Sequence, residues 1–501
     1  MVPLFTIFLL IVLIIVILVT CFEFFKSRDV KEEGTFLQEP PSPRRLPIIG
    51  HMHLLAGYEV PYQAFADLGK KFGSVFKLQL GSVKCVVVNE QRNVREALVT
   101  KGHHFDYRPN FERYQSLFSG NKENSLAFCD WSSTQKVRRE MLKAYTFPRA
   151  FTNKYVALEQ IISKETQQLI GNIEGEEGSV HLKPILLKKC ANIFLKHFCT
   201  ESFNSNDAEF EKMVENFDEV FYEVNQGYAA DFLPFLMPFH QKKMQKMSKV
   251  THEIREFITK KVIKDKFTSF NCETEPNDYL ESLIRHVKLE NQKDSESPTL
   301  DWEMALFALE DIIGGHSAVG NFLIKLFGFL VDEPEVQKKI QTEIDRTVGS
   351  DRSVTICDRN NMPYTEGVIF EAIRLIASPI VPRVANQTSS INGYKIEKGT
   401  VLFLNNYDLS MSEKLWDSPD KFQPERFVKN EKFFKPEHFL PFGGGRRSCM
   451  GYKLVQLVSF GVLSAIMQRF NIRKVQNESY TVPVGSLALG KDTFKFRFEK
   501  R

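Results

Sequence analysis

The pattern of hydrophobic residues opens with an almost wholly apolar run from Val2 to Phe22. As a helix this run would span about 31 Å, which is the thickness of the hydrocarbon core of a bilayer. No basic residue precedes the run and no small-residue cleavage site follows it, which argues against a cleaved signal peptide. Lys26, Arg28 and Lys31 follow, so the positive-inside rule places the rest of the chain in the cytosol. We therefore predict a transmembrane anchor over residues 1–25.

Residues 26–47 are polar and basic, and they end in a proline-rich segment from Pro40 to Pro47. Proline fixes the backbone and removes a hydrogen-bond donor, so this stretch cannot continue a helix and is expected to be stiff. We predict a linker that sets one large folded unit, residues 48–501, off the membrane.

Within this unit the hydrophobic pattern predicts strands at Val75–Leu80 and Cys85–Val88 and a helix at Gln91–Thr100. From Phe151 to about Thr347 the spacing is mainly helical, and strand signals return at Tyr394–Leu404. A small β portion beside a large α portion predicts a mainly α unit with small β-sheets, of the α+β class.

Composition narrows the function classes. The net charge of +4 is small for 501 residues, so nothing indicates nucleic acid as a partner. The 8 cysteines are scattered without a Cys-x-x-Cys pair, which suits a reducing compartment. The 44 phenylalanines indicate apolar surfaces beyond an ordinary core, such as a lipophilic pocket or a membrane-facing patch. The apolar stretch Asp231–Phe239 is a candidate for such a patch, with core packing as the alternative.

One cysteine stands in a distinctive setting. Cys449 lies in a glycine-rich turn that opens into an apolar helix from Tyr452 to Phe460. Backbone N–H groups and the dipole of a helix N-terminus lower the pKa of a thiol. The turn from Phe442 to Gly451 matches Phe-x-x-Gly-x-Arg-x-Cys-x-Gly at every fixed position, which disfavours a merely structural cysteine. We interpret Cys449 as a metal-ligating thiolate, shielded from water by Phe442.

This motif resembles the haem-binding turn of the cytochrome P450 family, whose iron takes a cysteine thiolate as its proximal ligand. The resemblance implies the cytochrome P450 fold and haem b (iron protoporphyrin IX), with Cys449 as both metal ligand and catalytic residue. Phe442, Gly445 and Gly451 would shape the cofactor-binding turn, and the guanidinium of Arg447 suits a haem propionate.

Further motifs occur in the order that the family has. Trp131 resembles the start of its Trp-x-x-x-Arg motif, but Gln135 stands in place of the arginine. The resemblance implies propionate contacts from Trp131, Gln135 and Arg383, although a solvated Arg383 is an equal alternative. It also implies that Glu371, Arg374 and a more distant arginine form a buried structural triad. That third member is Arg426.

The long helix expected from about Leu300 to Val331 carries the main departure. Gly314-Gly315 aligns with the family's Ala/Gly-Gly-x-Asp/Glu-Thr motif, and these glycines would leave room for dioxygen over the iron. Ser317 replaces the acid and Ala318 the alcohol that relay protons in the family. We expect Gly315, Ser317 and Ala318 to be catalytic positions of a rewired relay, with His316 a packing residue.

Other readings of the chain have different consequences. The spacing Gly315-His316-Ser317 also resembles a hydrolase nucleophile elbow, but an elbow requires a preceding strand and the pattern there is helical. No nucleotide-binding fingerprint occurs, so electrons would come from a partner, NADPH-cytochrome P450 reductase, with cytochrome b5 as a second candidate. A basic face for an acidic donor, or simply a solvated face, would comprise Lys136, Arg138, Arg139, Lys143 and Arg446.

Within the family, four stretches resemble the Spook and Spookier type of the insect Halloween group: Gly314–Asn321, Ser378–Pro382, Phe403–Asp408 and Pro436–Tyr452. Membership there implies an endoplasmic-reticulum monooxygenase that oxidises a sterol derived from 7-dehydrocholesterol, early in ecdysteroid biosynthesis. The expected pocket walls are 105–118, 232–239, 376–381 and 484–489. The missing acid and alcohol leave two alternatives, a haem-thiolate isomerase or dehydratase and a non-catalytic haem-dependent sterol sensor.

Overall fold

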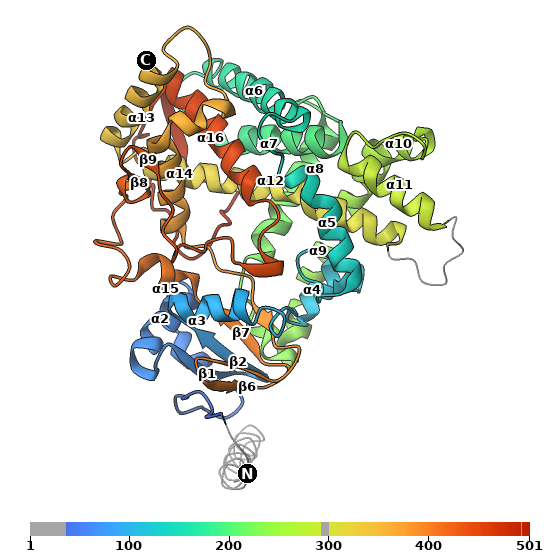
Figure 1. Ribbon diagram of the computed structural model, residues 1–501, viewed down its shortest axis with the longest axis vertical. Coiled ribbons are helices and arrows are strands. Elements are labelled where there is room, and N and C mark those ends of the chain that lie inside the picture. The colour runs from blue at the N-terminus through green and yellow to red at the C-terminus, as the bar shows by residue number, and fades with distance from the viewer. Residues whose placement is uncertain (1–36, 292–299, 492) are drawn as a thin grey trace, which may run out of the picture.

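A computed structural model describes residues 37–291, 300–491 and 493–501 of the chain (Figure 1). The predicted anchor, residues 1–25, and the first part of the predicted linker lie outside the described residues, so both stay predictions. Within the described part the chain forms a large helical region and a smaller β region, which Figure 1 places at opposite ends of the long axis. The expected mainly α fold with small β-sheets is confirmed.

The β region is built on a four-stranded sheet in the order β1-β2-β7-β4. The β1–β2 hairpin is antiparallel, and β2 pairs in parallel with β7 so that Cys85 lies opposite Val401. Because β2 and β7 are far apart in sequence, this pairing joins the two ends of the folded unit. The strands are β1 (Val75–Leu80), β2 (Val83–Val88), β7 (Val401–Leu404) and β4 (Arg383–Val384).

Smaller sheets lie elsewhere. A three-stranded antiparallel sheet in the order β10-β11-β3 contains β10 (Phe470–Arg473), β11 (Lys495–Lys500) and β3 (Val180–His181). Two hairpins pair β5 (Ser389–Ile391) with β6 (Tyr394–Ile396) and β8 (Val428–Lys429) with β9 (Lys432–Phe433).

Helices supply most of the remaining structure. The α-helices are α2 (Pro61–Phe72), α3 (Gln91–Arg95), α4 (Glu112–Leu117), α5 (Ser133–Thr146), α6 (Asn153–Glu174), α7 (Leu182–Cys199), α8 (Ala208–Val224), α9 (Met237–Phe257), α10 (Lys264–Ser269), α11 (Tyr279–Asn291), α12 (Trp302–Leu330), α13 (Pro334–Thr347), α14 (Pro363–Ile376), α15 (Asn406–Met411) and α16 (Tyr452–Arg469).

Helix α12 runs through the middle of the molecule (Figure 1). Its N-cap, Asp301, accepts a hydrogen bond from the amide of Met304 at 2.7 Å, which explains where the helix begins. Among the described residues α12 alone is long and apolar enough to cross a membrane, and 78% of its most apolar window is buried inside the protein. It is therefore the central helix of the fold, around which its neighbours pack.

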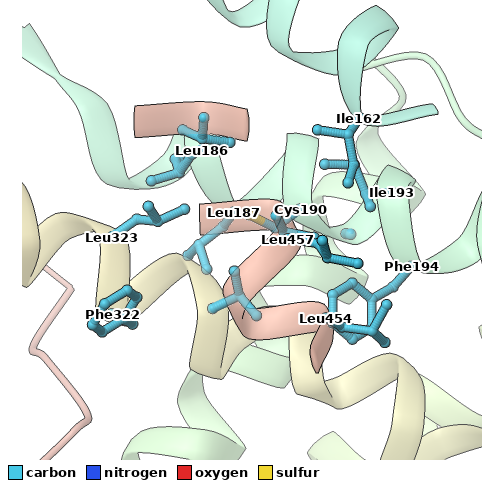
Figure 2. Close-up of a cluster of buried hydrophobic side chains, with 14 of the residues drawn as sticks. Ile162, Leu186, Leu187, Cys190, Ile193, Phe194, Phe322, Leu323, Leu454 and Leu457 are labelled. Carbon is cyan, nitrogen blue, oxygen red and sulfur yellow. The ribbon is translucent and has the colours of Figure 1, made fainter. Parts of the chain in front are cut away.

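Helices α6, α7, α12 and α16 share one hydrophobic core (Figure 2). Leu187 and Phe194 of α7 approach α12 where that helix carries glycine. A Cβ added at Gly320 would lie 2.6 Å from Leu187 Cδ2, and one added at Gly315 would lie 3.0 Å from Phe194 Cε1. The glycines of α12 therefore permit the close approach of α7.

The described part of the predicted linker does not stand free of the body. Gln38 forms an isolated bridge with Tyr394, and the amide of Lys77 in β1 donates to Pro41 O at 2.8 Å. This proline-rich segment is extended, so its carbonyl groups are available to accept hydrogen bonds from the sheet beside it. The stretch thus contacts the fold as well as leading to it.

Candidate active site

The turn before α16 brings Cys449 to the helix entrance, as expected. The amide of Cys449 donates to Phe442 O at 3.0 Å, which closes the turn on itself. Gly445 has φ +65°, and a Cβ there would lie 2.1 Å from Leu98 O, so no other residue fits without displacing the backbone. Gly451 stands at the N-cap of α16.

The Cys449 residue is exposed, yet enough protein surrounds its sulfur for burial to raise the thiol pKa. Backbone hydrogen bonds from Gly451 and Tyr452 and the charge of Arg139 act in the opposite direction and favour the thiolate. Among the described residues no group of three or more His, Cys, Asp or Glu is placed to hold a metal ion. A metal ion bound at Cys449 would favour the thiolate through its charge.

Three buried arginines lie near this turn. Arg383 is 2% exposed and donates through Nη2 to Arg447 O at 3.2 Å, and Arg447 donates to Cys129 O at 2.5 Å. Arg108 is also buried and donates to the carbonyl groups of Val381 and Pro382, both at 2.9 Å. The structure therefore brings Arg383 and Arg447 together, as the resemblance implied, and adds Arg108.

Two of these arginines keep hydrogen-bond donors that are not used. Arg383 Nε and Nη1 and Arg447 Nε are buried without a hydrogen-bond partner among the described residues. Burial and the nearby Arg447 lower the pKa of Arg383 to about 9, and burial and both neighbours lower the pKa of Arg108 well below its usual range. Like charges buried together with free donors favour an anionic ligand, so the site fits the carboxylate groups of a haem.

Sequence reasoning missed Arg108 as a charged member of this group. It lies inside the stretch 105–118 that was expected only to form an apolar wall, and no motif marks it. Its position is set by long-range packing against the segment before Arg383, which the sequence does not display.

Trp131 and Gln135 lie in different surroundings. The Arg446 guanidinium carbon is 4.7 Å from the ring centroid of the half-buried Trp131, and Arg446 also pairs with Asp106. Gln135 is fully buried and donates from Nε2 to Leu126 O at 2.6 Å. The propionate contacts of Trp131 and Gln135 stay predictions, and Gln135 already has an internal partner for one amide hydrogen.

Between Glu310 and Gly320 of α12, the half-buried positions are Asp311, Gly314, Gly315 and Ala318, and their spacing places them on one helix face. A Cβ at Gly314 would lie 3.0 Å from Phe217 of α8, so this face also packs against neighbouring helices. The roles of Gly315, Ser317 and Ala318 in oxygen chemistry stay predictions. Gly315 has in addition the packing role against α7 described above.

The position at which the family motif has an acidic residue, 317 in this chain, is isolated from solvent. Ser317 is fully buried, and its Oγ is 3.5 Å from Nε2 of His316. His316 Nδ1 is 2.7 Å from Ile313 O, and burial lowers the pKa of His316 to about 4, so this imidazole is neutral at pH 7. The helix is continuous through Ser317, which contradicts a nucleophile elbow.

The expected triad is present. Arg374 Nη2 and Arg426 Nε lie 2.7 Å and 3.2 Å from the same carboxylate oxygen of Glu371. The Glu371 and Arg374 side chains are 0% exposed, and the amide of Gln423 also donates to Glu371 at 2.9 Å. This network joins α14 to the chain that leads toward the cysteine turn.

The predicted basic face needs one correction. Arg138 is 1% exposed and donates to Asn124 O and Glu123 O, so it satisfies backbone carbonyls inside the protein and cannot present its charge to a partner. Helical periodicity explains the difference, because Arg138 lies three residues from the buried Gln135 on the same face of α5. Lys136 and Lys143 are exposed.

The stretch Asp231–Phe239 divides between surface and core. Phe235 and Phe239 are 61% and 83% exposed, whereas Leu233 and Met237 are buried. Pro238 lies in the first turn of α9, where its missing N–H costs no helical hydrogen bond.

A mainly α fold with a cysteine at a helix entrance, and with buried arginines beside it that keep donors unused among the described residues, suits the haem-thiolate class of protein. The chain belongs to the cytochrome P450 family, whose model, described as Cytochrome P450, matches residues 40–498. It is 37% identical over 486 residues to Cytochrome P450 307a1 of Drosophila melanogaster, covering 91% of this chain and 88% of that protein. It is 31% identical over 448 residues to a Steroid 17-alpha-hydroxylase/17,20 lyase of Rana dybowskii, covering 87% and 85%.

Proposed function

We propose that this chain is a monooxygenase that oxidises a sterol derived from 7-dehydrocholesterol in an early step of ecdysteroid biosynthesis. Membership of the family makes it a haem-dependent monooxygenase, an oxidoreductase. The sterol substrate is supported by the identity with the Drosophila and Rana relatives, the second of which is named for a steroid reaction. The resemblance to Spook-type enzymes supplies the particular pathway.

One observation carries the haem assignment in this chain: beside the turn that presents Cys449, buried guanidinium nitrogens of Arg383 and Arg447 lack hydrogen-bond partners within the described part of the chain. Arg383, Arg447 and Arg108 would bind the propionates, and Cys449 would be the single protein ligand of the iron. When bound, haem supplies reductive activation of dioxygen, which the thiolate favours by donating electron density.

The chain's own residues would control water and protons at the reacting side. The half-buried face of α12 that includes Gly315 and Ala318 would border the oxygen site. Ala318 cannot donate or accept a proton, and Ser317 Oγ lies 3.5 Å from Nε2 of the neutral His316. A substrate hydroxyl would therefore supply part of the proton path that the usual acid and alcohol supply in the family.

That same departure favours one second candidate. A haem-thiolate isomerase or dehydratase would rearrange an oxygenated sterol without dioxygen or external reductant, and it would not need the acid and alcohol. Dependence on oxygen distinguishes the two reactions, and the absence of any product would favour the sterol sensor.

We further propose a single-pass anchor in the endoplasmic-reticulum membrane, with the catalytic unit in the cytosol. Exposed Phe235 and Phe239 suit contact with the apolar edge of a bilayer. Family members typically receive electrons from a reductase, which here would be NADPH-cytochrome P450 reductase, with cytochrome b5 as a possible second donor.

The experiment is product formation from 7-dehydrocholesterol and its 3-oxo derivatives in reductase-containing microsomes, with and without dioxygen. Oxygen-dependent and NADPH-dependent product is expected, and Cys449→Ser microsomes are the matched control. Product without oxygen would replace the monooxygenase by the isomerase, and no product from any of these sterols would refute the proposed substrate.

A further inference from the structure

Two lysines are buried in the core beside α12. Lys325 of α12 is 0% exposed and Lys183 of α7 is 1% exposed. Lysine is almost never fully buried unless its charge is paired, because removing an ammonium group from water is costly. Both side chains therefore indicate a specific structural demand.

The demand comes from a loop without helix or strand, residues 483–490, between β10 and β11. Lys325 Nζ donates to Pro483 O at 3.0 Å and also to Ser486 O. It forms no ion pair with a carboxylate among the described residues, and burial lowers its pKa to about 7. The two loop carbonyls accept the hydrogen bonds of its ammonium group.

Lys183 holds the other end of this loop. Its Nζ donates to Leu489 O at 2.9 Å and to Gly490 O at 3.0 Å, and it pairs with Asp218 of α8 at 2.7 Å. The loop is thus held from two different helices through four backbone carbonyl groups.

A third side chain connects this arrangement to the motif of α12. Asn321 Oδ1 accepts the amide of Leu489 at 3.0 Å, while its Nδ2 donates to Asp218 at 2.7 Å and to Ser317 O at 2.8 Å. Asn321 lies one turn beyond Ser317. The loop is therefore fixed next to the helix segment that departs from the family motif.

The opposite side of the loop is also fixed. The amide of Gly485 donates to Ile376 O at 2.7 Å, at the start of the segment that leads to Arg383. Gly485 has φ +81°, which favours glycine, and a Cβ there would lie 2.6 Å from Val60 Cγ2, so the loop passes close to Val60. It spans from α12 to the segment that carries a candidate haem contact.

We propose that Lys183, Asn321 and Lys325 are positioning residues that fix loop 483–490 as a wall of the substrate site and thereby determine which substrate fits. The inference rests on the proposed function only in placing a haem-bound substrate site beside this loop. None of the three residues touches the reacting atoms in this scheme, because each acts through the loop backbone.

The test uses the full-length, haem-loaded protein with Lys325→Met, which retains most of the apolar stem and removes the donors. Hydrogen–deuterium exchange of the peptide covering 483–490 should accelerate about tenfold, as expected for the loss of the two hydrogen bonds from Lys325 Nζ. The matched control is Lys189→Met. Lys189 is a buried lysine of α7, and it donates to Gln168 and Ser205 and not to loop 483–490.

A second readout reports the shape of the site. Clotrimazole, a bulky imidazole, should lose about tenfold in affinity for the Lys325→Met protein, whereas imidazole alone should bind as before. Equal losses for both compounds, or equal exchange in the Lys325→Met and Lys189→Met proteins, would overturn the proposal. If Lys325→Met yields no haem-loaded protein, Lys183→Met is measured in the same way.

The unmodified enzyme provides an outcome that needs no variant. Loop 483–490 should be protected from exchange to a degree comparable with α12, and rapid exchange would refute the positioning role. Neither readout uses a sterol, so a failure of the sterol assay leaves this test intact. Conversely, unchanged exchange of loop 483–490 in the Lys325→Met protein would refute the positioning role and would not affect the proposal of sterol oxidation.

Discussion

Replacing Arg374 by methionine should prevent the chain from holding haem. Arg374 binds both carboxylate oxygens of Glu371, and it donates to Ser410 O and Pro419 O, both at 2.7 Å, and to Lys421 O at 3.1 Å. The variant would leave a fully buried carboxylate with only the longer contact to Arg426 and the amide of Gln423, and it would leave three carbonyl groups without their donor.

The expected cost follows from these contacts. Removing one partner of a buried ion pair costs about 3–5 kcal/mol. Each buried carbonyl that loses its donor adds about 1–3 kcal/mol. The sum approaches the whole free energy of unfolding of a typical domain, about 5–15 kcal/mol. We therefore expect little folded Arg374→Met protein at 25 °C and no thiolate-type carbon-monoxide spectrum.

The assay compares Arg374→Met with Arg473→Met in parallel preparations. Arg473 forms an ion pair with Glu499 at 2.8 Å, and the two side chains are 46% and 37% exposed, so water can replace that contact. The control should lose about 1 kcal/mol or less of stability in urea unfolding and should retain its spectrum. Equal haem content and equal urea midpoints in the two variants would refute the reasoning.

Four further outcomes are expected. Cys449→Ser should abolish the thiolate-type carbon-monoxide spectrum while leaving a membrane-anchored protein, and a retained spectrum would contradict the ligand assignment. Arg383→Gln should weaken haem retention about tenfold or more against apomyoglobin, whereas Arg383→Lys should lose less, because the lysine keeps a charge for the anion. His316 has a pKa of about 4 in the folded protein, against 6.5 in the unfolded chain. As pH falls from 6.5 to 4 only the unfolded chain gains the proton, so the protein should lose about 3 kcal/mol of stability. His316→Phe should reduce this loss of stability at acid pH in urea titrations. Ser317→Asp combined with Ala318→Thr should raise the fraction of NADPH that yields product, and unchanged coupling would show that the departure is mechanistically silent.

The local sequence pattern predicted those helices and strands whose ends are determined by residues nearby in the sequence. Strand β1 begins and ends at Val75 and Leu80 as expected, because the hairpin turn and the alternation fix both ends. The helix after Cys449 was expected only to Phe460 but continues to Arg469. The added turns are buried on nearly every side, so they show no amphipathic period that a sequence pattern could reveal.

The site was predictable where a motif encodes it and obscure where packing creates it. The turn around Cys449 and the meeting of Arg383 with Arg447 followed from the resemblance. Arg108 and Lys325 did not, since a lone cation in a sequence is normally solvated. Their burial depends on carbonyl groups more than 150 residues away, at Val381 and Pro483.

The residues that would bind haem are different from the residues that would direct the reaction of dioxygen. The arginine group and the Glu371 triad contain buried charge, so a change at either of them is costly before chemistry begins. Ser317 and Ala318 carry no charge, so the departure at these two positions leaves both groups intact. A chain can therefore lose the usual acid and alcohol and still bind haem. The loop held by Lys183 and Lys325 then determines which group of the substrate lies next to Ser317 and Ala318. For this reason a restored acid and alcohol should alter coupling without altering haem content, whereas a released loop should alter ligand selection without altering either.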